Sequence, residues 1–368
     1  MKLIRFLRGN IAVAAAVLCA LACAACIIGW GALSRLLPAQ REYERWRGEN
    51  SMSFGQISCF MPVDEKATLE QIYTFRNEIQ KKLAEAALEA KNGLFSDAWC
   101  TFGKVTATGE HGSGKLSVTA VGGSFFDFHP LKLISGSYFS DKDLMRDRVL
   151  LDEDSAWLLF GGRELEGMPL TIEGKPFVVA GVIAREDDRI SKKAYTSGMG
   201  IYMSYEAFMR LYEQEDADPS AYFTESGISC YELTMAEPVG GMTYALAQEK
   251  FPLENGVLVN NAQRYSVSNI FKILRDFTSR SMQTQGVILP YWENAARSTE
   301  DRCALLLLLS VLTGIYPIVF AVRCAVVYGR RGAGKFRGAE GLHGAALSGD
   351  IAGIDALQLI LVGAQQLF

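Results

Sequence analysis

The chain has 368 residues, of which 49% are hydrophobic and 21% charged, and its formal net charge at pH 7 is −4. This negative balance argues against a nucleic-acid-binding protein, because such proteins neutralise phosphates with a basic surface. Aromatic and branched residues are spread along the sequence, so the chain can bury a core and is not disordered.

The first expected element is a membrane-spanning helix over residues 11–33. Basic residues precede an uncharged, mostly apolar stretch from Gly9 to Ser34, which is long enough to cross a hydrocarbon core of about 30 Å. A basic start before an apolar run is also typical of a signal peptide, and the residues before Cys23 resemble a lipoprotein cleavage site. Because the apolar run continues past Cys23, we favour an uncleaved helix.

Strand and helix patterns then alternate. Residues 35–50 are charged and are expected to form a solvated helical stalk near the membrane surface. A strand is predicted over residues 54–61 and a long helix over residues 65–91, in which apolar residues recur every three or four positions. Strands at 99–108 and 116–121 follow, joined by a turn.

The central stretch, Gly123 to Asp188, has the most regular pattern. Paired aromatic residues open it, Gly136 marks a turn, and a short strand at 149–151 precedes a short helix that ends at Gly161. Two β-branched or aromatic runs then flank Glu173-Gly174-Lys175-Pro176, and a Gly-containing connection of this length predicts a β-hairpin. The residues themselves predict a β-rich module.

The order of these pieces resembles the extracytoplasmic domain of MacB/FtsX-type ABC transporter permeases. Three motifs of that family occur in register: F-x-P-x-x-L-x-x-G-x-x-F-S-x-x-D, V-L-L-D…A-x-x-L-F-G and G-x-x-(I/L)-x-I-x-G-x-x-F-x-V-x-G-V. They are carried here by Phe128, Pro130, Leu133, Gly136, Phe139, Ser140, Asp143, Val149, Leu150, Leu151, Asp152, Ala156, Leu159, Phe160, Gly161, Gly167, Leu170, Ile172, Gly174, Phe177, Val179, Gly181 and Val182. The resemblance implies an extracytoplasmic domain that moves when a separate cytoplasmic ATPase closes on ATP.

After residue 188 the pattern loosens and then returns to alternating helices and strands. The expected elements are a strand at 201–203, a helix at 205–212, an acidic loop with Glu215, Asp216 and Asp218, a strand at 229–235, a helix at 241–251, a strand at 256–260 and an amphipathic helix at 267–280. Strand, helix and strand on both sides of the β-rich module predict one α/β subdomain interrupted by an insertion.

A second spanning helix is expected at residues 303–327. The run from Cys303 to Val322 is uncharged and lies between Arg302 and Arg323, and Pro317 is a candidate kink within it. A buried helix of a soluble protein is the competing interpretation.

Basic residues narrowly favour a topology with both chain ends in the cytoplasm. Eight of them flank one side of the two spans and six flank the other, and acidic neighbours count for little in this rule. The first group is Lys2, Arg5, Arg8, Arg323, Arg330, Arg331, Lys335 and Arg337, and the second is Arg35, Arg41, Arg45, Arg47, Arg297 and Arg302. The outer placement of the middle domain therefore rests partly on the resemblance.

The expected fold class is a membrane-anchored α+β protein, with two transmembrane helices flanking an extracytoplasmic domain. The expected divisions are a cytoplasmic N-terminus (1–10), transmembrane helix 1 (11–33), the MacB-like extracytoplasmic domain (34–302), transmembrane helix 2 (303–327) and a cytoplasmic basic loop with an atypical tail (328–368). Within the domain, residues 51–121 and 228–290 are assigned to the α/β subdomain and residues 122–227 to the β-rich subdomain.

The tail departs from the family, whose members have two further spanning helices. Residues 338–350 are small and polar, and the apolar run 351–364 contains Asp355 and is too short to span. An interfacial helix and the altered end of a truncated reading frame both fit this pattern.

Two stretches match the phosphate-binding pattern G-x-x-x-x-G-K, residues 109–115 and 329–335, and neither is expected to bind a nucleotide. A P-loop follows a strand, precedes a helix and supplies a Ser or Thr for magnesium. The first stretch leads into a strand, which predicts a hairpin turn, and the second follows a membrane helix and precedes Phe336. The ATPase signature of ABC proteins is also missing, so ATP hydrolysis is assigned to a partner.

Four basic residues beyond the second span, Arg330, Arg331, Lys335 and Arg337, form the predicted surface site. Attraction to anionic lipid headgroups, worth about 1 kcal/mol per charge, is sufficient to explain them. Docking to an acidic groove on a cytoplasmic ATPase is the alternative.

No pattern supports catalysis, so the chain is not expected to be an enzyme or to bind a cofactor. His111, His129 and His343 have no nucleophile or ligand partner nearby in sequence, and solvated or structural roles are expected for them.

Metal sites and a disulfide framework are not expected either. The acidic groups at 141–143, 152–154 and 186–188 lack the spacing of a calcium loop and are interpreted as solvated turns. Of eight cysteines, three lie between the apolar runs, so at most one disulfide can form there. These three are Cys59, Cys100 and Cys230.

The expected function is that of a transmembrane ABC transporter subunit in the bacterial plasma membrane. It would couple ATP hydrolysis by a separate ATPase to export or extraction of peptides, lipids or lipoproteins. The expected partners are the ATPase, membrane lipid and a second permease copy, with no nucleic acid. The alternative is a stand-alone, membrane-anchored binding or sensor module derived from a truncated permease.

Overall fold

The computed structural model describes residues 2–88, 90, 93–140, 143–186, 190–194, 199–212, 227–276 and 286–340. The chain forms two compact units, residues 24–310 and a second made of residues 1–23 together with 311–368. The first unit contains the β-sheet and the helices that pack on it.

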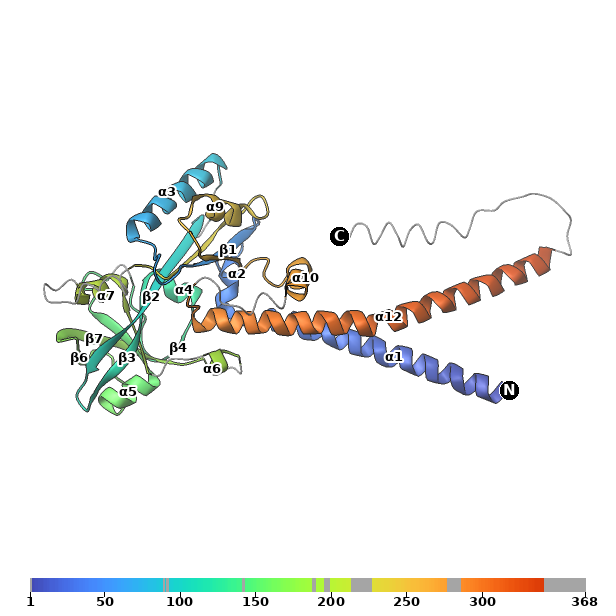
Figure 1. Ribbon diagram of the computed structural model, residues 1–368, viewed down its shortest axis with the longest axis horizontal. Helices are drawn as coiled ribbons and strands as arrows, with labels where there is room; N and C mark the ends of the chain where they lie inside the picture. The colour runs from blue at the N-terminus through green and yellow to red at the C-terminus, as the bar shows by residue number, and fades with distance from the viewer. Residues whose placement is uncertain are drawn as a thin grey trace. The chain divides into compact units, whose positions relative to one another are not determined.

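The strands described by the structure all belong to one ten-stranded sheet (Figure 1). They are β1 (Phe54–Phe60), β2 (Phe95–Thr108), β3 (Ser113–Gly123), β4 (Lys132–Gly136), β5 (Arg148–Asp152), β6 (Pro169–Ile172), β7 (Lys175–Ala184), β8 (Gly200–Ser204), β9 (Cys230–Ala236) and β10 (Val257–Asn260). Their order is β10-β1-β9-β2-β3-β8-β5-β7-β4, with β6 paired to β2 and β7. Neighbours are antiparallel except for the parallel pairs β3–β8 and β5–β7.

Helices precede, interrupt and follow these strands. They are α1 (Lys2–Leu33), the 3-10 helix η1 (Pro38–Arg41), α2 (Glu42–Arg47), α3 (Leu69–Glu85), α4 (Phe125–Phe128), α5 (Glu153–Phe160), α6 (Ser191–Ala194), α7 (Tyr205–Tyr212), α9 (Met242–Lys250), α10 (Val267–Arg275) and α12 (Tyr291–Glu340). The fold of the first unit is therefore α+β, as the sequence predicts.

Four strands at one end of the sheet combine two β-α-β units from distant parts of the chain. The first unit is β1, α3 and β2, the second is β9, α9 and β10, and their strands pair antiparallel in the order β10-β1-β9-β2. This is the order of the split β-α-β, or ferredoxin-like, motif. Phe75 of α3, Tyr231 of β9 and Phe251 pack together between the sheet and both helices, with ring centroids 5.0 to 5.8 Å apart.

Helix α3 is shorter than its apolar pattern predicts. It begins after Thr68, whose side chain accepts a hydrogen bond from the Gln71 backbone N–H while the Gln71 side chain accepts one from the Thr68 backbone N–H, a capping box. The predicted apolar stripe is buried from Ile72 to Leu83. Before Thr68, residues 63–65 instead form a bend and Ala67 forms an isolated β-bridge with Ile228.

Both predicted hairpins are present. The Gly109 N–H donates to the Gly112 carbonyl in the turn between β2 and β3, so the first glycine-rich stretch is a hairpin turn, as expected. The β6–β7 hairpin turns on Glu173 and Gly174, which have φ of 44° and 77°. A two-residue type I′ turn requires a positive φ at both of its central residues. Lys175 and Pro176 therefore belong to β7 and not to the connection.

The centre of the sheet is covered on both faces. On one face α5 and α7 pack over a core that includes Val105, Leu116 and Phe208. On the other face α4 and residues 287–292 pack over Cys100 and Tyr202. Neither α4 nor β4 is predicted from the sequence, because both are short and their residues match the pattern of a turn.

The prediction of a solvated stalk over residues 35–50 is wrong. Gln40 and Glu42 are 2% and 3% exposed, and the Gln56 side chain on β1 donates a hydrogen bond to the Ala39 carbonyl at 2.8 Å. The segment packs on the sheet because β1 presents this amide to it.

Two helices in the described residues are long and apolar enough to cross a membrane, over Ile11–Leu33 and Tyr291–Val327. Core helices of soluble proteins and signal sequences pass the same test. Large apolar side chains on both are exposed, with Ile28 at 72% and Ile318 at 64%. Helix α12 begins twelve residues before the expected Cys303 and contains Pro317.

Some expectations lie outside the described residues. They are the acidic loop at 215–218, the end of the helix at 277–280, residues 141 and 187–188 of the acidic groups, His343, and the tail run 351–364.

Candidate functional site

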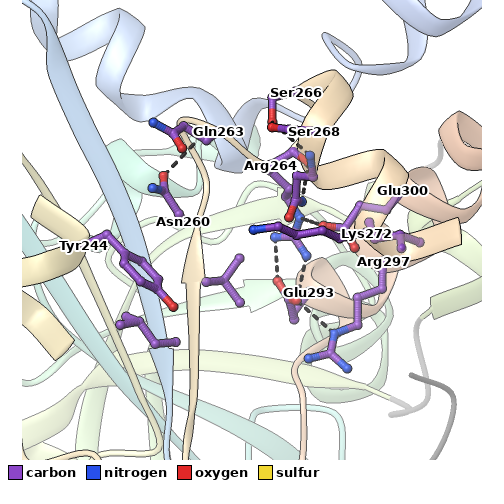
Figure 2. Close-up of a pocket in the computed structure, with 14 residues that line it drawn as sticks. Tyr244, Asn260, Gln263, Arg264, Ser266, Ser268, Lys272, Glu293, Arg297 and Glu300 are labelled. Carbon is purple, nitrogen blue, oxygen red and sulfur yellow. Dashed lines mark hydrogen bonds and ion pairs between the residues drawn. The ribbon is translucent and has the colours of Figure 1, made fainter. Parts of the chain in front are cut away.

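A fully buried arginine, Arg264, lies between β10 and α10 and binds groups from three parts of the chain, one of which is the start of α12 (Figure 2). Its Nη1 and Nη2 atoms donate to the two carboxylate oxygens of Glu293 at 2.8 and 2.6 Å. Its Nε donates to Glu300 at 2.7 Å, and Nη1 also lies 2.8 Å from the Gln40 Oε1 and 3.0 Å from the Asn261 Oδ1. We call these five residues together with Arg297 the Arg264 cluster.

The charges of the Arg264 cluster balance. Glu293 and Glu300 face Arg264 and Arg297, whose Nε donates to Glu293 at 3.1 Å. Burial lowers the pKa of Arg264, but the Glu293 carboxylate outweighs that effect, so the pKa lies above its usual value. Such an ion pair tolerates burial only when most of its hydrogen-bonding capacity is used, as it is here.

Local sequence explains how the cluster is held. The Asn260 side chain accepts a hydrogen bond from the Gln263 N–H, and Ser266 caps α10 by accepting one from Asn269, which in turn donates to the Arg264 carbonyl. These bonds fix the turn that carries Arg264.

On α12, residues 297 and 300 follow residue 293 by four and seven positions, so the three residues share one face of the helix.

Buried hydrogen bonds continue from the Arg264 cluster through the sheet. The Asn261 amide donates to Ser58 at 2.7 Å, and Ser58 donates to Glu232 at 2.8 Å. The other carboxylate oxygen of Glu232 lies 2.5 Å from the His129 Nε2. Each of these side chains is at most 3% exposed, and together they connect Arg264 to His129.

His129, the last residue of this series of hydrogen bonds, contacts α12. The His129 ring lies with its centroid 4.5 Å from those of both Phe125 and Trp292. Trp292 precedes Glu293 in the first turn of α12. Two successive residues therefore hold the start of α12, one in an aromatic cluster and one on Arg264.

The segment after α1, which contains η1 and α2, is held close to His129 by Arg45. Arg45 donates to the Pro38 and Asp127 carbonyls at 2.7 Å and forms an ion pair with the buried Glu42. Burial raises the pKa of Glu42 to about 7, an effect that Arg45 partly offsets.

The hydrogen bonds of the Arg264 cluster hold η1, the turn after β10 and the start of α12 together. The described residues contain no group of three or more His, Cys, Asp and Glu side chains that could hold a metal ion. A cavity of about 400 Å³ lies beside the cluster, and Tyr244, Ser268 and Lys272 also line it (Figure 2).

The structure tests only part of the predicted site residues. Arg330, Arg331, Lys335 and Arg337 lie within α12, but the structure describes nothing of their side chains, so this site stays a prediction.

The structure separates the two described histidines. His111 is an exposed turn residue, whereas His129 is buried and its Nε2 lies 2.5 Å from the Glu232 carboxylate.

Asp152 is not part of a solvated turn, which corrects the prediction. It is 3% exposed and caps α5 by accepting from the Ser155 N–H at 2.8 Å. Its other oxygen accepts from the Gly200 N–H at 2.7 Å and from Arg185 Nε at 2.8 Å.

All eight cysteines are free thiols in the structure. Cys100 on β2 and Cys230 on β9 lie directly opposite each other, whereas Cys59 belongs to a different core.

Sequence reasoning missed the Arg264 cluster. Its members come from positions 40, 261, 264, 293, 297 and 300, which no sequence pattern pairs. The spacing of Glu293, Arg297 and Glu300 before the apolar run was the available signal.

A family model matches the middle of the chain. Residues 63–229 match the family model of the MacB-like periplasmic core domain. No curated protein matches the sequence significantly.

Three solved structures similar to the chain are domains of transporters or permeases. The periplasmic region of MacB from Actinobacillus actinomycetemcomitans is 14% identical, with a TM-score of 0.39, over 66% of this chain and 99% of that one. The extracellular domain of the noncanonic ABC-type transporter YknZ from Gram-positive bacteria is 15% identical, with a TM-score of 0.36, over 56% and 100%. A domain of a putative permease protein from Porphyromonas gingivalis is 11% identical, with a TM-score of 0.33, over 64% and 99%.

The family model carries the assignment: residues 63–229 are a MacB-like periplasmic core domain.

Proposed function

We propose that the chain is the transmembrane subunit of an ABC transporter that works with a separate cytoplasmic ATPase. In this proposal α1 and the apolar part of α12 are two uncleaved spans of the bacterial plasma membrane. The folded domain lies outside, as a split α/β subdomain interrupted by a β-rich one. ATP hydrolysis moves this domain, for export or extraction of peptides, lipids or lipoproteins.

The observation that supports coupling most strongly is the bidentate pair of Arg264 and Glu293. Arg264 belongs to the folded domain, and Glu293 lies in the first turn of α12, the helix that includes the second apolar run. A displacement of the start of α12 must move the domain or break a buried ion pair, which costs about 3–5 kcal/mol when one partner is left alone.

Charge distribution supports the proposed partners. Arg330, Arg331, Lys335 and Arg337 would contact anionic headgroups on the cytoplasmic side. A second copy of the chain would complete the transporter. A catalytic role, a cofactor and nucleic-acid binding are not part of the proposal.

ATPase stimulation tests this function. The full chain is co-expressed with the ABC ATPase encoded beside it, purified and reconstituted into nanodiscs. We expect the two to co-purify and ATP hydrolysis to rise when the chain is present. Without co-purification or stimulation, the subunit proposal fails and a stand-alone binding or sensor module remains.

Replacement of the four basic residues by alanine tests their role. If they contact headgroups, the ATPase still co-purifies with the variant. Loss of the ATPase would instead assign them to docking.

A further inference from the structure

A second cleft lies on the sheet face opposite α5 and α7, between β2, β3 and β8 and the segment that leads into α12. Its volume is about 540 Å³, within the range of about 300–1,000 Å³ typical of small-molecule sites. Val63 and Ile288 are exposed apolar side chains of its lining, at 37% and 66%.

The lining is graded from apolar to polar along the strands. Phe102, Thr119 and Tyr202 are register partners across β2, β3 and β8 and form an apolar row. Lys104, Ser117 and Gly200 are the corresponding partners two residues away and form a polar row. Residues two apart in a strand share a face and are separated by about 7 Å, so both rows lie on one floor.

Aromatic groups close the apolar end. The Phe102 and Trp292 ring centroids are 5.8 Å apart, and Leu289 and Pro290 lie beside them in the lining. Trp292 is 4% exposed and is fixed against His129, so this wall is preformed.

Positive charge exceeds negative charge in the lining of the cleft. The charged residues of the lining are Lys66, Lys104, Arg185 and Asp152, which give a formal charge of three positive minus one negative, or +2. Asp152 forms an ion pair with Arg185, which also pairs with Asp154, so the positive charge of the lining beyond this group comes from Lys66 and Lys104.

We propose that this cleft binds a single-chain anionic amphiphile. Its acyl chain would lie along the apolar row against Trp292, and its phosphate or carboxylate would lie at the polar row near Lys104. This proposal rests on the proposed transporter function and adds a ligand class to it. Because Trp292 and Glu293 are consecutive, an occupied cleft contacts the same turn of α12 that Arg264 holds.

Photolabelling of the full chain tests the proposal without the ATPase. The chain is placed in phosphatidylcholine nanodiscs and irradiated with dodecyl phosphate that carries a diazirine in its alkyl chain. Labelled peptides are identified by mass spectrometry. We expect labelling of peptides with Phe102, Tyr202 or Trp292, competed by unlabelled dodecyl phosphate or laurate and not by dodecanol or dodecyltrimethylammonium. Competition by only one anion distinguishes a phosphate from a carboxylate headgroup.

Two variants separate charge from shape. Lys104→Glu should lower cleft labelling at least tenfold, and Thr119→Phe should lower it similarly by filling the floor between Phe102 and Tyr202. Lys115→Glu is the matched control, because Lys115 is exposed on β3 but does not line the cleft. Thermal unfolding of each variant verifies folding.

The proposal is overturned if labelling is confined to the apolar helices, if all four competitors act equally, or if both cleft variants label like Lys115→Glu. ATPase stimulation is a separate readout, so failure of the ligand site and failure of the transporter proposal can be told apart.

Discussion

The guanidinium of Arg264 and the carboxylate of Glu293 form two parallel hydrogen bonds, at 2.8 and 2.6 Å, with both side chains 1% exposed. One residue follows the last strand of the sheet, and the other lies in the first turn of α12. The pair therefore joins the folded domain to the first turn of α12.

Replacing Arg264 with Met should destabilise the folded domain by about 3–5 kcal/mol, because Glu293 and Glu300 would remain buried without their partner. Denaturant unfolding of the purified full chain, followed by tryptophan fluorescence, measures the effect. Arg297→Ala is the control and should cost less than about 1 kcal/mol, since Arg297 is 31% exposed. Adding Glu293→Gln to Arg264→Met should recover part of the loss. Equal effects of the two single variants would contradict a special role of Arg264.

Glu42 should make stability depend on pH. Burial raises the pKa of its carboxyl to about 7 in the folded protein, above the 4.5 expected when it is unfolded. Between these values the folded state binds more protons than the unfolded state, so the free energy of unfolding falls as pH rises from about 4.5 to 7.

A Glu42→Gln variant should lack this dependence and be more stable than the parent at pH 8. The difference in the free energy of unfolding between the two proteins is on the order of 3 kcal/mol at most, because a shift of one pKa unit is worth about 1.4 kcal/mol. Unfolding curves of both proteins from pH 5 to 8 measure it. Parallel pH profiles would show that Glu42 is ionised in the folded state.

Gly55 on β1 should not tolerate a side chain. A Cβ atom there would lie 2.0 Å from the Glu237 Oε2 and 2.3 Å from the Thr243 Oγ1. The Glu237 carboxylate accepts a hydrogen bond from the Thr243 hydroxyl at 2.6 Å at the start of α9, so neither group can move freely. Gly55→Ala should lower the free energy of unfolding by about 1–3 kcal/mol. Gly162→Ala, with no atom within 4 Å of the added carbon, should change it little.

Oxidation should link Cys100 to Cys230 and leave Cys59 free. Directly opposed residues of antiparallel strands have Cα atoms about 4.5–5.5 Å apart, within the range that a disulfide spans. Burial and a hydrogen bond with Cys100 raise the pKa of the Cys230 thiol well above its usual value, so little thiolate forms and the oxidation, in which copper-phenanthroline and oxygen take up the two electrons, should be slow. Copper-phenanthroline treatment, alkylation and peptide mapping identify the pair. A link that includes Cys59 would contradict the strand register.

Local signals predicted much of the fold. Gly161 ends α5 with a φ of 70° and Gly174 lies in the β6–β7 turn with a φ of 77°, and because both glycines are visible in the sequence, both elements could be predicted. Residues 35–50 show what local signals cannot predict. Their charges indicated solvent exposure, but part of the segment is buried, where the Gln56 amide and the Asp127 carbonyl form hydrogen bonds with it.

The Arg264 cluster could not be predicted for the same reason. An arginine in a polar turn has no local pattern that distinguishes a surface residue from a buried one. Only the fold brings Gln40, Asn261 and Glu293 around it. The spacing of Glu293 and Glu300 is visible in the sequence, but it does not identify Arg264 as their partner.

Labelling of an introduced cysteine tests the central claim, an extracytoplasmic domain between two spans, most directly. Leu144 is 98% exposed, so Leu144→Cys gives a reporter on the folded domain, and Lys2→Cys gives one on the N-terminus. Intact spheroplasts are treated with a membrane-impermeant maleimide, with the parent chain as the background for its native cysteines. The account predicts that Leu144→Cys is labelled in intact spheroplasts and Lys2→Cys only after permeabilisation, both on a full-length chain. Labelling of Leu144→Cys only after permeabilisation, or loss of residues 1–33 from the mature protein, would contradict it.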